Sequence, residues 1–460
     1  MLELEQAVEK ILASIPAPKS EVIPLSEAYG RIVAEKILAP TDLPPFDNSS
    51  MDGYAVRAQD VAAASPQNPI TLKLVGRVAA GEHFTGQLSP GQCIRIFTGS
   101  LVPAGADAVV MQEDTRVSAR DQTVANLPNA GTTSPSPPRS GGEGRGEVVS
   151  RAQGEIQILD SAKPWENIRF HGEDVKRDAV IAEPGTRLGA AHLGLLAATG
   201  IGQVTVYRQP TVALLATGSE LKEPTTDAQL APGQIFESNR AALTPLIAAT
   251  GAIPKILPLV PDTAEATRAA LTRAFAESDI VITCGGVSVG EMDFVKSAFE
   301  ELGGQLDFWK VAIKPGRPFV FGRLQPGTAA VSAASFSSMA ATGRRDAGAP
   351  WEKFLFGLPG NPVSAFVTFL LLARPALLRW QGATNVTLPS SLGILAEPIS
   401  NSDHRRHFVR VTVDAAGKIH PAGTQASHIL SSLASANGMI DVPAKTDLAA
   451  GTSVQSLRWE

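Results

Sequence analysis

Apolar runs that end in glycine, proline or a polar residue recur through the second half of the chain. The clearest of them are TVALLATG, KILPLV, DIVITCGG, LDFWKVAI and KFLFGLPG. Segments of helical character separate several of these runs, for example residues 263–277 and 293–302. Near-continuous apolar strands that alternate with helices are typical of a parallel sheet covered on both faces. The pattern therefore predicts a parallel or mixed α/β domain over residues 191–385.

Shorter apolar runs on either side of this domain predict further β structure. ITLKLVGRV and QCIRIFTG alternate with glycine and proline, which favours a small β-rich domain over residues 47–165. HFVRVTV and GKIHPAG predict a C-terminal β domain over residues 386–460. Residues 1–46 and 166–190 flank the first β-rich domain, so we expect them to form one discontinuous linker or dimerisation domain.

Two segments interrupt these predicted domains. Residues 131–147, GTTSPSPPRSGGEGRGE, are rich in glycine, proline and serine and have almost nothing to bury, which predicts a disordered insertion. Residues 325–349 are rich in small residues with no firm period. We interpret both as surface loops inside domains.

The N-terminus predicts an amphipathic helix that docks on the rest of the protein. Its helically spaced apolar residues are Val8, Ile11, Leu12 and Ile15. The segment lacks the positive flank and apolar block of a signal peptide. The most apolar stretch, FVTFLLLARPALL, is interrupted by Arg374 and Pro375, and we expect it to stop short of a membrane span. These features predict a soluble cytoplasmic protein with no membrane partner.

Composition narrows the class of protein. A length of 460 residues leaves room for about three domains with substantial cores. The net charge of -5 argues against a nucleic-acid binder, which usually carries a basic footprint. Cys93 and Cys284 lie far apart without metal-ligand spacing, and they fit a reducing compartment better than a disulfide framework.

The segment FDNSSMDGYAV, residues 46–56, is too polar for a core. Its plain interpretation is a capped turn, because Asn, Asp, Ser and Gly hydrogen-bond locally or tolerate unusual backbone angles. A functional loop is the alternative.

Residues that can carry chemistry follow the predicted strands of the α/β domain, at the ends where ligands bind in such sheets. They are Thr217-Gly218-Ser219-Glu220, Pro261-Asp262-Thr263, Gly285 to Gly290 with Glu291 and Asp293, Lys314 to Pro318, and Pro359 to Ser364. Each group has a structural alternative. The glycines could serve a tight turn, Asp262-Thr263 and Asn361-Pro362 could cap helices, and the cations could be solvated.

Together these groups favour a binding site over separate structural roles. Glycine backbone N–H groups and helix N-termini attract anions. Lys310, Lys314 and Arg317 add fixed positive charge, and the Arg fork suits phosphate oxygens. Mg²⁺ prefers oxygen ligands and often bridges them to a phosphate. The candidate oxygen ligands here are the carboxylates of Glu220, Asp262 and Asp293. Hydrolase mechanisms lack a Gly-x-Ser-x-Gly serine or an HExxH metal site.

The motifs resemble those of the molybdopterin molybdenumtransferases, a family related to the C-terminal part of gephyrin. In order, they are PFDNSSMDGYAVR, IRIFTGSLVPAGADAVVMQE, NIRFHGED, ATGSEL, CGGVSVGEMDF, FWKVAIKPGRP, GLPGNPVSA and SHILSSLASAN. The resemblance runs from the N-terminal helix nearly to the end of the chain.

The resemblance implies an elongated homodimer with four domains per chain, including a molybdopterin-binding α/β domain and a C-terminal β-barrel-like domain. The implied reaction inserts molybdate into adenylylated molybdopterin with Mg²⁺ and yields molybdenum cofactor plus AMP. The site would lie between the α/β domain of one subunit and the β-rich domain of the other, which makes the Asp52 loop the partner's contribution. An upstream adenylyltransferase and downstream molybdoenzymes or chaperones are further implied partners.

The resemblance also assigns roles to residues. The catalytic set is Asp52, Asp262, Asp293, Lys310 and Lys314, and the metal ligands are Glu220, Asp262 and Asp293. The binding set is Thr98, Asp174, Gly285, Gly286, Ser288, Gly290, Arg317, Pro359, Gly360, Asn361 and Ser364.

Three departures from the family pattern bear on this assignment. Many members carry an Asp where this chain has Ser219, so one carboxylate is missing and we expect weaker metal binding. Arg169-Phe170-His171 replaces an arginine-rich stretch, and the insertion at 325–349 lies between two strands near the site. The competing interpretations are a molybdopterin adenylyltransferase and a gephyrin-like scaffold that binds a partner peptide.

Overall fold

The computed structural model describes residues 1–117, 154–287, 293–325 and 352–459. The insertion at 131–147, and all of 325–349 beyond its first residue, therefore lie outside the described residues. The chain forms two compact, discontinuous units. The first comprises Met1–Glu35, Glu183–Gly189 and Gln203–Glu460, and the second comprises Lys36–Ala182 and Ala190–Gly202.

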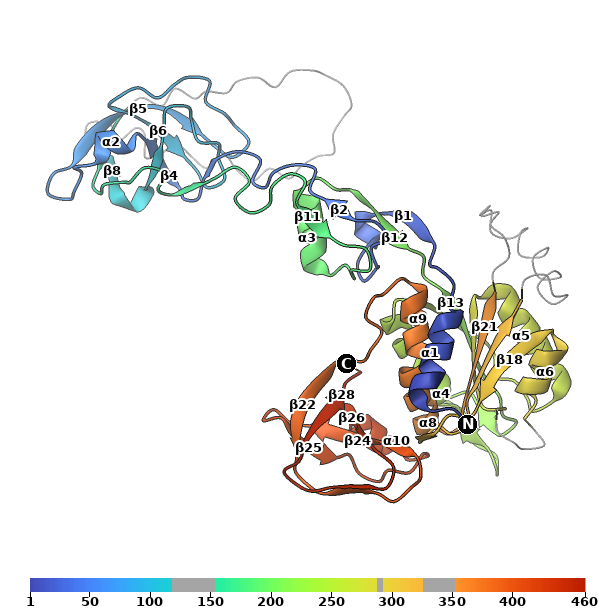
Figure 1. The fold of residues 1–460 in the computed structure, drawn as a ribbon. Helices are drawn as coiled ribbons and strands as arrows, with labels where there is room; N and C mark the ends of the chain where they lie inside the picture. The colour runs from blue at the N-terminus through green and yellow to red at the C-terminus, as the bar shows by residue number, and fades with distance from the viewer. Residues whose placement is uncertain (118–153, 288–292, 326–351, 460) are drawn as a thin grey trace. The chain divides into compact units, whose positions relative to one another are not determined.

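A six-stranded mixed sheet lies at the centre of the first unit (Figure 1). In spatial order its strands are β16 (Ile253–Ile256), β13 (Thr211–Ala216), β17 (Ile280–Cys284), β21 (Lys353–Leu358), β20 (Val320–Leu324) and β18 (Gly304–Trp309). The first four are parallel, and β20 runs antiparallel to both its neighbours. Strand β18 therefore points the same way as β21. The carboxyl ends of β13, β17, β21 and β18 lie at one edge of the sheet, as the α/β prediction requires.

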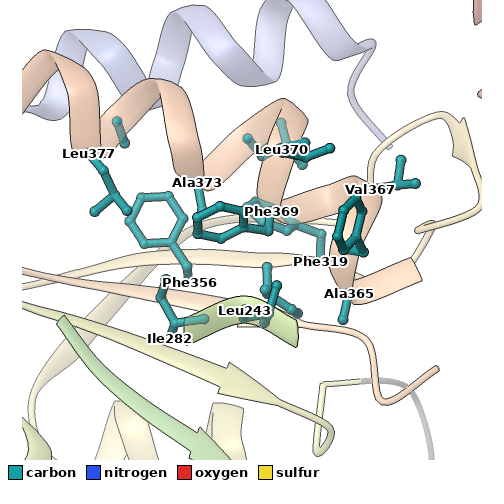
Figure 2. Packing of buried hydrophobic residues seen from close by; sticks show 14 of the residues in the cluster. Leu243, Ile282, Phe319, Phe356, Ala365, Val367, Phe369, Leu370, Ala373 and Leu377 are labelled. Atoms are coloured by element: carbon teal, nitrogen blue, oxygen red, sulfur yellow. The ribbon is translucent and has the colours of Figure 1, made fainter. Parts of the chain in front are cut away.

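Helices cover both faces of this sheet and explain its continuous apolar runs. They are α4 (Asn239–Ala249), α5 (Ala264–Glu277), α6 (Val295–Glu301), α8 (Pro362–Thr368) and α9 (Arg374–Trp380). Along β17, Ile280 and Ile282 join the core that contains α4, α8 and α9, whereas Val281 joins the core that contains α5 and α6. Figure 2 shows the first core, where the rings of Phe319, Phe356 and Phe369 pack together. Successive strand residues face opposite sides of the sheet, and helices cover both sides. The three β17 residues named above, each facing one of the two cores, are therefore apolar.

The apolar stretch around Arg374 forms one continuous helical run, so the expected interruption there is wrong. The run Pro362–Trp380 spans 19 residues and is long and apolar enough to cross a membrane, but 83% of its most apolar window is buried, as in a core helix. A proline inside a helix removes one N–H bond and crowds the preceding turn. Here a π-helical turn, η3 (Phe369–Ala373), lies directly before Arg374 and Pro375. The Arg374 guanidinium donates to two backbone carbonyls of the segment that follows α9.

The predicted N-terminal helix is confirmed as α1 (Leu4–Ser14), which packs against α9. Its buried residues are Leu4, Ala7 and Ile11, and Ile15 at its C-cap joins the same core, so the predicted face is confirmed at Ile11 and Ile15. Val8 and Leu12 are half-buried at the side of this face. Strand β1 (Ser20–Pro24) then pairs with β12 (Gln203–Tyr207), and a 3₁₀ turn, η1 (Leu25–Glu27), follows β1.

The C-terminal β domain is a closed barrel. Its strands are β22 (Ser390–Leu395), β24 (Arg406–Val413), β25 (Lys418–Pro421), β26 (Gly438–Val442) and β28 (Ser453–Leu457), and β24 also pairs with β26 to close the ring. Helix α10 (Leu430–Ala434) and the pair β23 (Ile399–Asn401) with β27 (Thr446–Leu448) complete it. A short strand that follows β18, β19 (Ile313–Lys314), pairs with β24, so the barrel contacts the segment beyond that strand end.

The second unit is built on a β sheet, as predicted. Its order is β7 (Ala108–Met111), β4 (Gly53–Val56), β6 (Gln92–Ile96), β5 (Ile70–Val78), β9 (Gly154–Ile158) and β8 (Thr115–Val117). Short helices α2 (Ala58–Val61), η2 (Gln112–Asp114) and α3 (Ala190–Ala198) belong to the same unit. Two small ladders join segments before and after this sheet, β3 (Asn48–Ser49) with β10 (Ile168–Arg169) and β2 (Ile37–Leu38) with β11 (Val180–Ala182). The four-domain boundaries stay a prediction.

Candidate functional site

The turns after β13, β17 and β21 meet at the carboxyl edge of the sheet. Gly285 has φ +93, and a Cβ atom there would lie 2.7 Å from the carbonyl oxygen of Thr217. A Cβ atom on Gly360 would lie 3.7 Å from the Cα of Gly285. Only glycine combines this backbone angle with such close approach. Glycine at position 285 therefore lets the turns after β13 and β17 come together, and its own N–H donates to the Leu358 carbonyl at 3.0 Å.

Asp262 and Ser219 bind each other across this edge. The Ser219 N–H donates to Asp262 Oδ2 at 2.9 Å, and the Asp262 N–H donates to Ser219 Oγ at 3.0 Å. The N-cap of α5 is Thr263, whose hydroxyl accepts from the Ala266 N–H. Thr263, and not Asp262, therefore caps the N-terminus of α5. The Asp262 carboxylate is held at the edge by Ser219.

Glu220 begins a segment that a buried ion network holds in place. The side chain of Glu220 is exposed, and its carbonyl accepts from the Ile235 N–H at 2.9 Å where β14 (Leu221–Lys222) pairs with β15 (Ile235–Phe236). Beneath them, buried Arg240 donates to Glu237 and, through one nitrogen, to both oxygens of Glu223. Burial lowers the pKa of Arg240, but the two carboxylates outweigh it and raise that pKa overall. This network fixes the base of the loop that carries Glu220.

The PGNP turn starts helix α8. Asn361 is its N-cap with a proline at the first turn, as the sequence predicted, yet its side chain makes no capping hydrogen bond to the described residues. The Asn239 amide, at the start of α4, donates to the Gly360 carbonyl at 2.7 Å and anchors the turn. Pro359 is buried, and Ser364 is buried with its carbonyl accepting from the Thr368 hydroxyl. The exposed groups of this turn are therefore Gly360 and Asn361.

The lysines follow β18. Lys310 has φ +71, and its N–H and C=O are bonded to Phe319 and Leu2. Lys314 lies 3.9 Å, Nζ to Oδ2, from Asp403 of the barrel domain. Arg317 is exposed. The cations predicted from the sequence thus lie on the segment that leaves the carboxyl end of β18.

The barrel adds charged residues that the sequence reasoning missed. Two nitrogens of the Arg405 guanidinium donate to the Asp403 carboxylate, at 3.2 and 2.9 Å. The third nitrogen donates to the Ile313 carbonyl at 3.4 Å. Hydrogen bonds from Arg405 hold the pKa of Asp403 well below its ordinary value. Burial, and then the charge of Lys314, lowers the pKa of His407 to about 4. The basic run His404-Arg405-Arg406-His407, which leads into β24 and includes its first two residues, could have indicated this contribution.

The polar loop of the second unit is a capped turn that also presents a carboxylate. The Ser49 hydroxyl donates to the Met51 carbonyl, and Asp47 accepts from the His171 N–H. Asp52 is exposed and accepts at 2.8 Å from both the N–H and the hydroxyl of Thr98. These bonds, led by the N–H, lower the pKa of Asp52. The turn thus holds Asp52 ionised and accessible.

Not every predicted residue joins one of these groups. Asp174 is exposed in the second unit, where its N–H donates to the Leu43 carbonyl. Gly286 has φ +66 and faces the side chain of Val295 at the start of α6. Ser288 and Gly290 lie outside the described residues.

Comparison with known proteins places these features in a family. Three family models match the chain in order, "MoeA N-terminal region (domain I and II)" over residues 2–200, "Probable molybdopterin binding domain" over 213–379 and "MoeA C-terminal region (domain IV)" over 393–459. The molybdopterin molybdenumtransferase of Haemophilus influenzae is 35% identical over 446 residues, which cover 96% of this chain and 94% of that protein. The chain belongs to the molybdopterin molybdenumtransferase family.

A further relative and a solved structure support this family assignment. Molybdopterin molybdenumtransferase 2 of Mycobacterium tuberculosis is 35% identical over 440 residues, covering 94% of this chain and 93% of that protein. The crystal structure of the molybdopterin biosynthesis MoeA protein from Pyrococcus horikoshii superimposes with a TM-score of 0.71 at 29% identity and covers 100% of both chains. The resemblance inferred from the motifs is therefore confirmed.

The three carboxylates predicted to bind a metal, Glu220, Asp262 and Asp293, follow strands of this sheet. The described residues hold no group of three or more acidic, His or Cys side chains that could enclose a metal by themselves. Mg²⁺ usually keeps waters and binds one or two carboxylates together with substrate phosphates. Glu220 and Asp262 at the strand edge offer such carboxylates, and Asp293 follows β17 at the start of α6.

Proposed function

We propose that this protein inserts molybdate into adenylylated molybdopterin and releases AMP, forming the molybdenum cofactor. The observation that carries the proposal is the carboxyl edge of the sheet. There Asp262 and the close glycine turns lie beyond the ends of β13, β17 and β21. The segment of Lys310 and Lys314 leaves the end of β18 and contacts Asp403 and Arg405 of the barrel. Molybdate and a phosphoanhydride are both anionic, so the site must collect several negative charges. Cations and exposed N–H groups do this.

Each group at the edge has a part in this reaction. Lys310, Lys314 and Arg317 bind phosphate or molybdate oxygens. Gly285, Gly286 and the PGNP turn bring backbone close to the phosphate and the pterin. Cleavage of the phosphoanhydride transfers no electrons: the bond between the two phosphates breaks, AMP leaves with one phosphate, and an oxygen nucleophile takes its place on the other.

Mg²⁺ is part of the proposal. Glu220, Asp262 and Asp293 would hold it, and when bound it neutralises charge on the departing phosphate. Many family members have a second carboxylate at position 219. Here the Ser219 hydroxyl accepts from the Asp262 N–H instead, so we propose that this chain binds Mg²⁺ more weakly than they do.

We further propose a homodimer with composite sites. Asp52, Thr98 and Asp174 of the second unit would complete the site of the other subunit. The support is chemical: Asp52 is ionised, exposed and held by Thr98, although it has no structural task beyond this turn among the described residues.

The cellular setting follows the same proposal. Cys93 and Cys284 are buried free thiols, as suits a reducing cytoplasm. An upstream adenylyltransferase would supply the substrate, and molybdoenzymes or their chaperones would take the product.

The test is an assay with adenylylated molybdopterin and the purified protein. AMP release that needs molybdate supports insertion, whereas ATP consumption with free molybdopterin would support an adenylyltransferase. Neither activity, together with capture of a peptide partner, would support a scaffold. The family match over all domains, rather than the molybdopterin-binding domain alone, favours insertion.

A further inference from the structure

Trp309, the last residue of β18, holds two lysines over its indole ring. Lys296 Nζ lies 3.9 Å from the ring centroid and Lys310 Nζ lies 4.2 Å from it. Cation–π contacts are strongest with Trp and operate within about 6 Å. Lys296 comes from α6, which packs on β18, so the two lysines reach the same ring from different elements.

The backbone of Lys310 makes this arrangement possible. In an extended strand, successive side chains point to opposite faces, so Trp309 and Lys310 would diverge. Lys310 instead has φ +71, a left-handed angle that is uncommon for residues other than glycine. Its N–H donates to the Phe319 carbonyl at 2.9 Å, and its carbonyl accepts from the Leu2 N–H at 3.3 Å, so both backbone groups fix this angle. The left-handed residue brings the lysine back over its neighbour's ring. Strain that is fixed by its surroundings is common at functional sites.

Two ammonium groups on one ring repel each other. Burial lowers the pKa of Lys296 below its ordinary value, Asp293 and Glu300 oppose this change, and the charge of Lys310 adds to it. A bound dianion would relieve the repulsion, and the ring would keep both cations in place between binding events.

We propose that Lys296, Lys310 and Trp309 form a subsite for one tetrahedral dianion, with Lys296 as an additional binding residue and Trp309 as its positioning residue. The inference deepens the proposed function, on which it rests. The shared chemistry is a tetrahedral oxyanion, which is either the phosphate of a nucleoside monophosphate or molybdate.

Calorimetric titration of the full chain with AMP and, separately, with molybdate tests the subsite. Lys296→Met should weaken binding of one of the two anions by about tenfold, and that anion identifies the occupant. Lys418→Met is the control, because Lys418 is an exposed lysine of the barrel and the variant has the same net charge. Equal affinity of Lys296→Met and wild type for both anions would overturn the proposal.

Trp309 variants separate positioning from simple packing. Trp309→Phe keeps a weaker π face and should lose less anion affinity than Trp309→Leu, while both keep the melting temperature of a folded chain. Equal losses in the two variants would show that the ring acts only by its bulk and would refute the positioning role.

The pH dependence gives a readout that packing alone would not move. A bound dianion favours the protonated ammonium, so affinity should fall as pH rises through the lowered pKa of Lys296. Lys296→Arg should restore binding and remove this decline, because Arg stays protonated. An unchanged decline in Lys296→Arg would contradict the role of Lys296.

The two levels of the proposal can fail separately. If wild type released AMP while Lys296→Met matched it in affinity and KM, only the subsite would fail. If Lys296-dependent anion binding persisted without molybdate-dependent AMP release, only the proposed reaction would fail.

Discussion

The Nζ of Lys314 lies 3.9 Å from Asp403 Oδ2, and this pair joins the strand edge of the α/β domain to the barrel. Two nitrogens of Arg405 donate to the same carboxylate. Strand β19 (Ile313–Lys314) adds backbone pairing with β24 beside them. In the proposed site, the barrel therefore contributes Asp403 as an ion-pair partner of Lys314 and brings a second cation, Arg405, next to it.

Arg405→Lys tests this contribution of the barrel. Lysine keeps the charge but cannot form the two-nitrogen contact with Asp403 or reach the Ile313 carbonyl in the same geometry. We expect KM for molybdate to rise about tenfold, with a change in unfolding free energy below about 1 kcal/mol. Steady-state kinetics and denaturant unfolding measure the two effects. An unchanged KM would mean that the barrel only supports the fold here.

His407 should make the barrel sensitive to acid. Its pKa in the folded protein is about 4, against 6.5 for an ordinary His. At this one group the unfolded chain then binds more protons between these values, so the contribution of His407 to stability falls as pH drops from 6.5 to 4 and is constant outside this window. The full effect is about 3 kcal/mol. His407→Leu should flatten this slope in urea unfolding followed across pH 4 to 7, and an identical slope in the variant would refute the assignment.

Gly285→Ala should disrupt the strand edge. Its φ of +93 disfavours a side chain, and the added Cβ would lie 2.7 Å from the Thr217 carbonyl oxygen. We expect a loss of about 2 to 4 kcal/mol in stability together with loss of AMP release. Gly233→Ala is the matched control, because Gly233 has φ +86 and no atom within 4 Å of the Cβ position. If both variants lost the same stability, close approach at Gly285 would not matter.

Asp262→Asn tests the metal ligands without removing the contact to Ser219. The amide oxygen can still accept from the Ser219 N–H, so the melting temperature should stay within about 2 °C of wild type. The lost charge should abolish Mg²⁺-stimulated AMP release. Ser219→Asp should act in the opposite direction and lower the Mg²⁺ concentration for half-maximal activity. Stimulation by Mg²⁺ that survives in Asp262→Asn would exclude this carboxylate as a ligand.

Mixed dimers test the composite site. Chains with Asp52→Ala and chains with Asp293→Ala should each be inactive as homodimers, yet mixed dimers should regain activity through one intact site. Co-expression with two different tags allows the mixed species to be purified. Inactive mixed dimers would place both residues in a site made by a single chain.

Much of the α/β domain could be predicted because its determinants are local. The β17 run Ile280–Cys284 is apolar except at Thr283 and is followed by glycine, so both its burial and its turn can be inferred from neighbouring residues. The antiparallel β20 inside this sheet could not be inferred, because the pairing depends on segments distant in sequence.

Side-chain partners were hardest to predict. The sequence indicated Lys314 and Asp262 as site residues, but the Asp403–Arg405 pair reaches Lys314 from about a hundred residues away in sequence. From the sequence, Ser219 was notable only because it replaces a carboxylate of the family pattern. In the structure its N–H donates to the Asp262 carboxylate and its hydroxyl accepts from the Asp262 N–H. Such contacts depend on tertiary packing, which neither periodicity nor turn chemistry encodes.

The most direct test of the central claim is AMP release from adenylylated molybdopterin with and without molybdate, followed by chromatography. The account predicts that wild-type protein releases AMP in proportion to molybdenum cofactor formed, and that Lys314→Met does so at a small fraction of the rate. AMP release that is independent of molybdate, or that is unaffected in Lys314→Met, would contradict it.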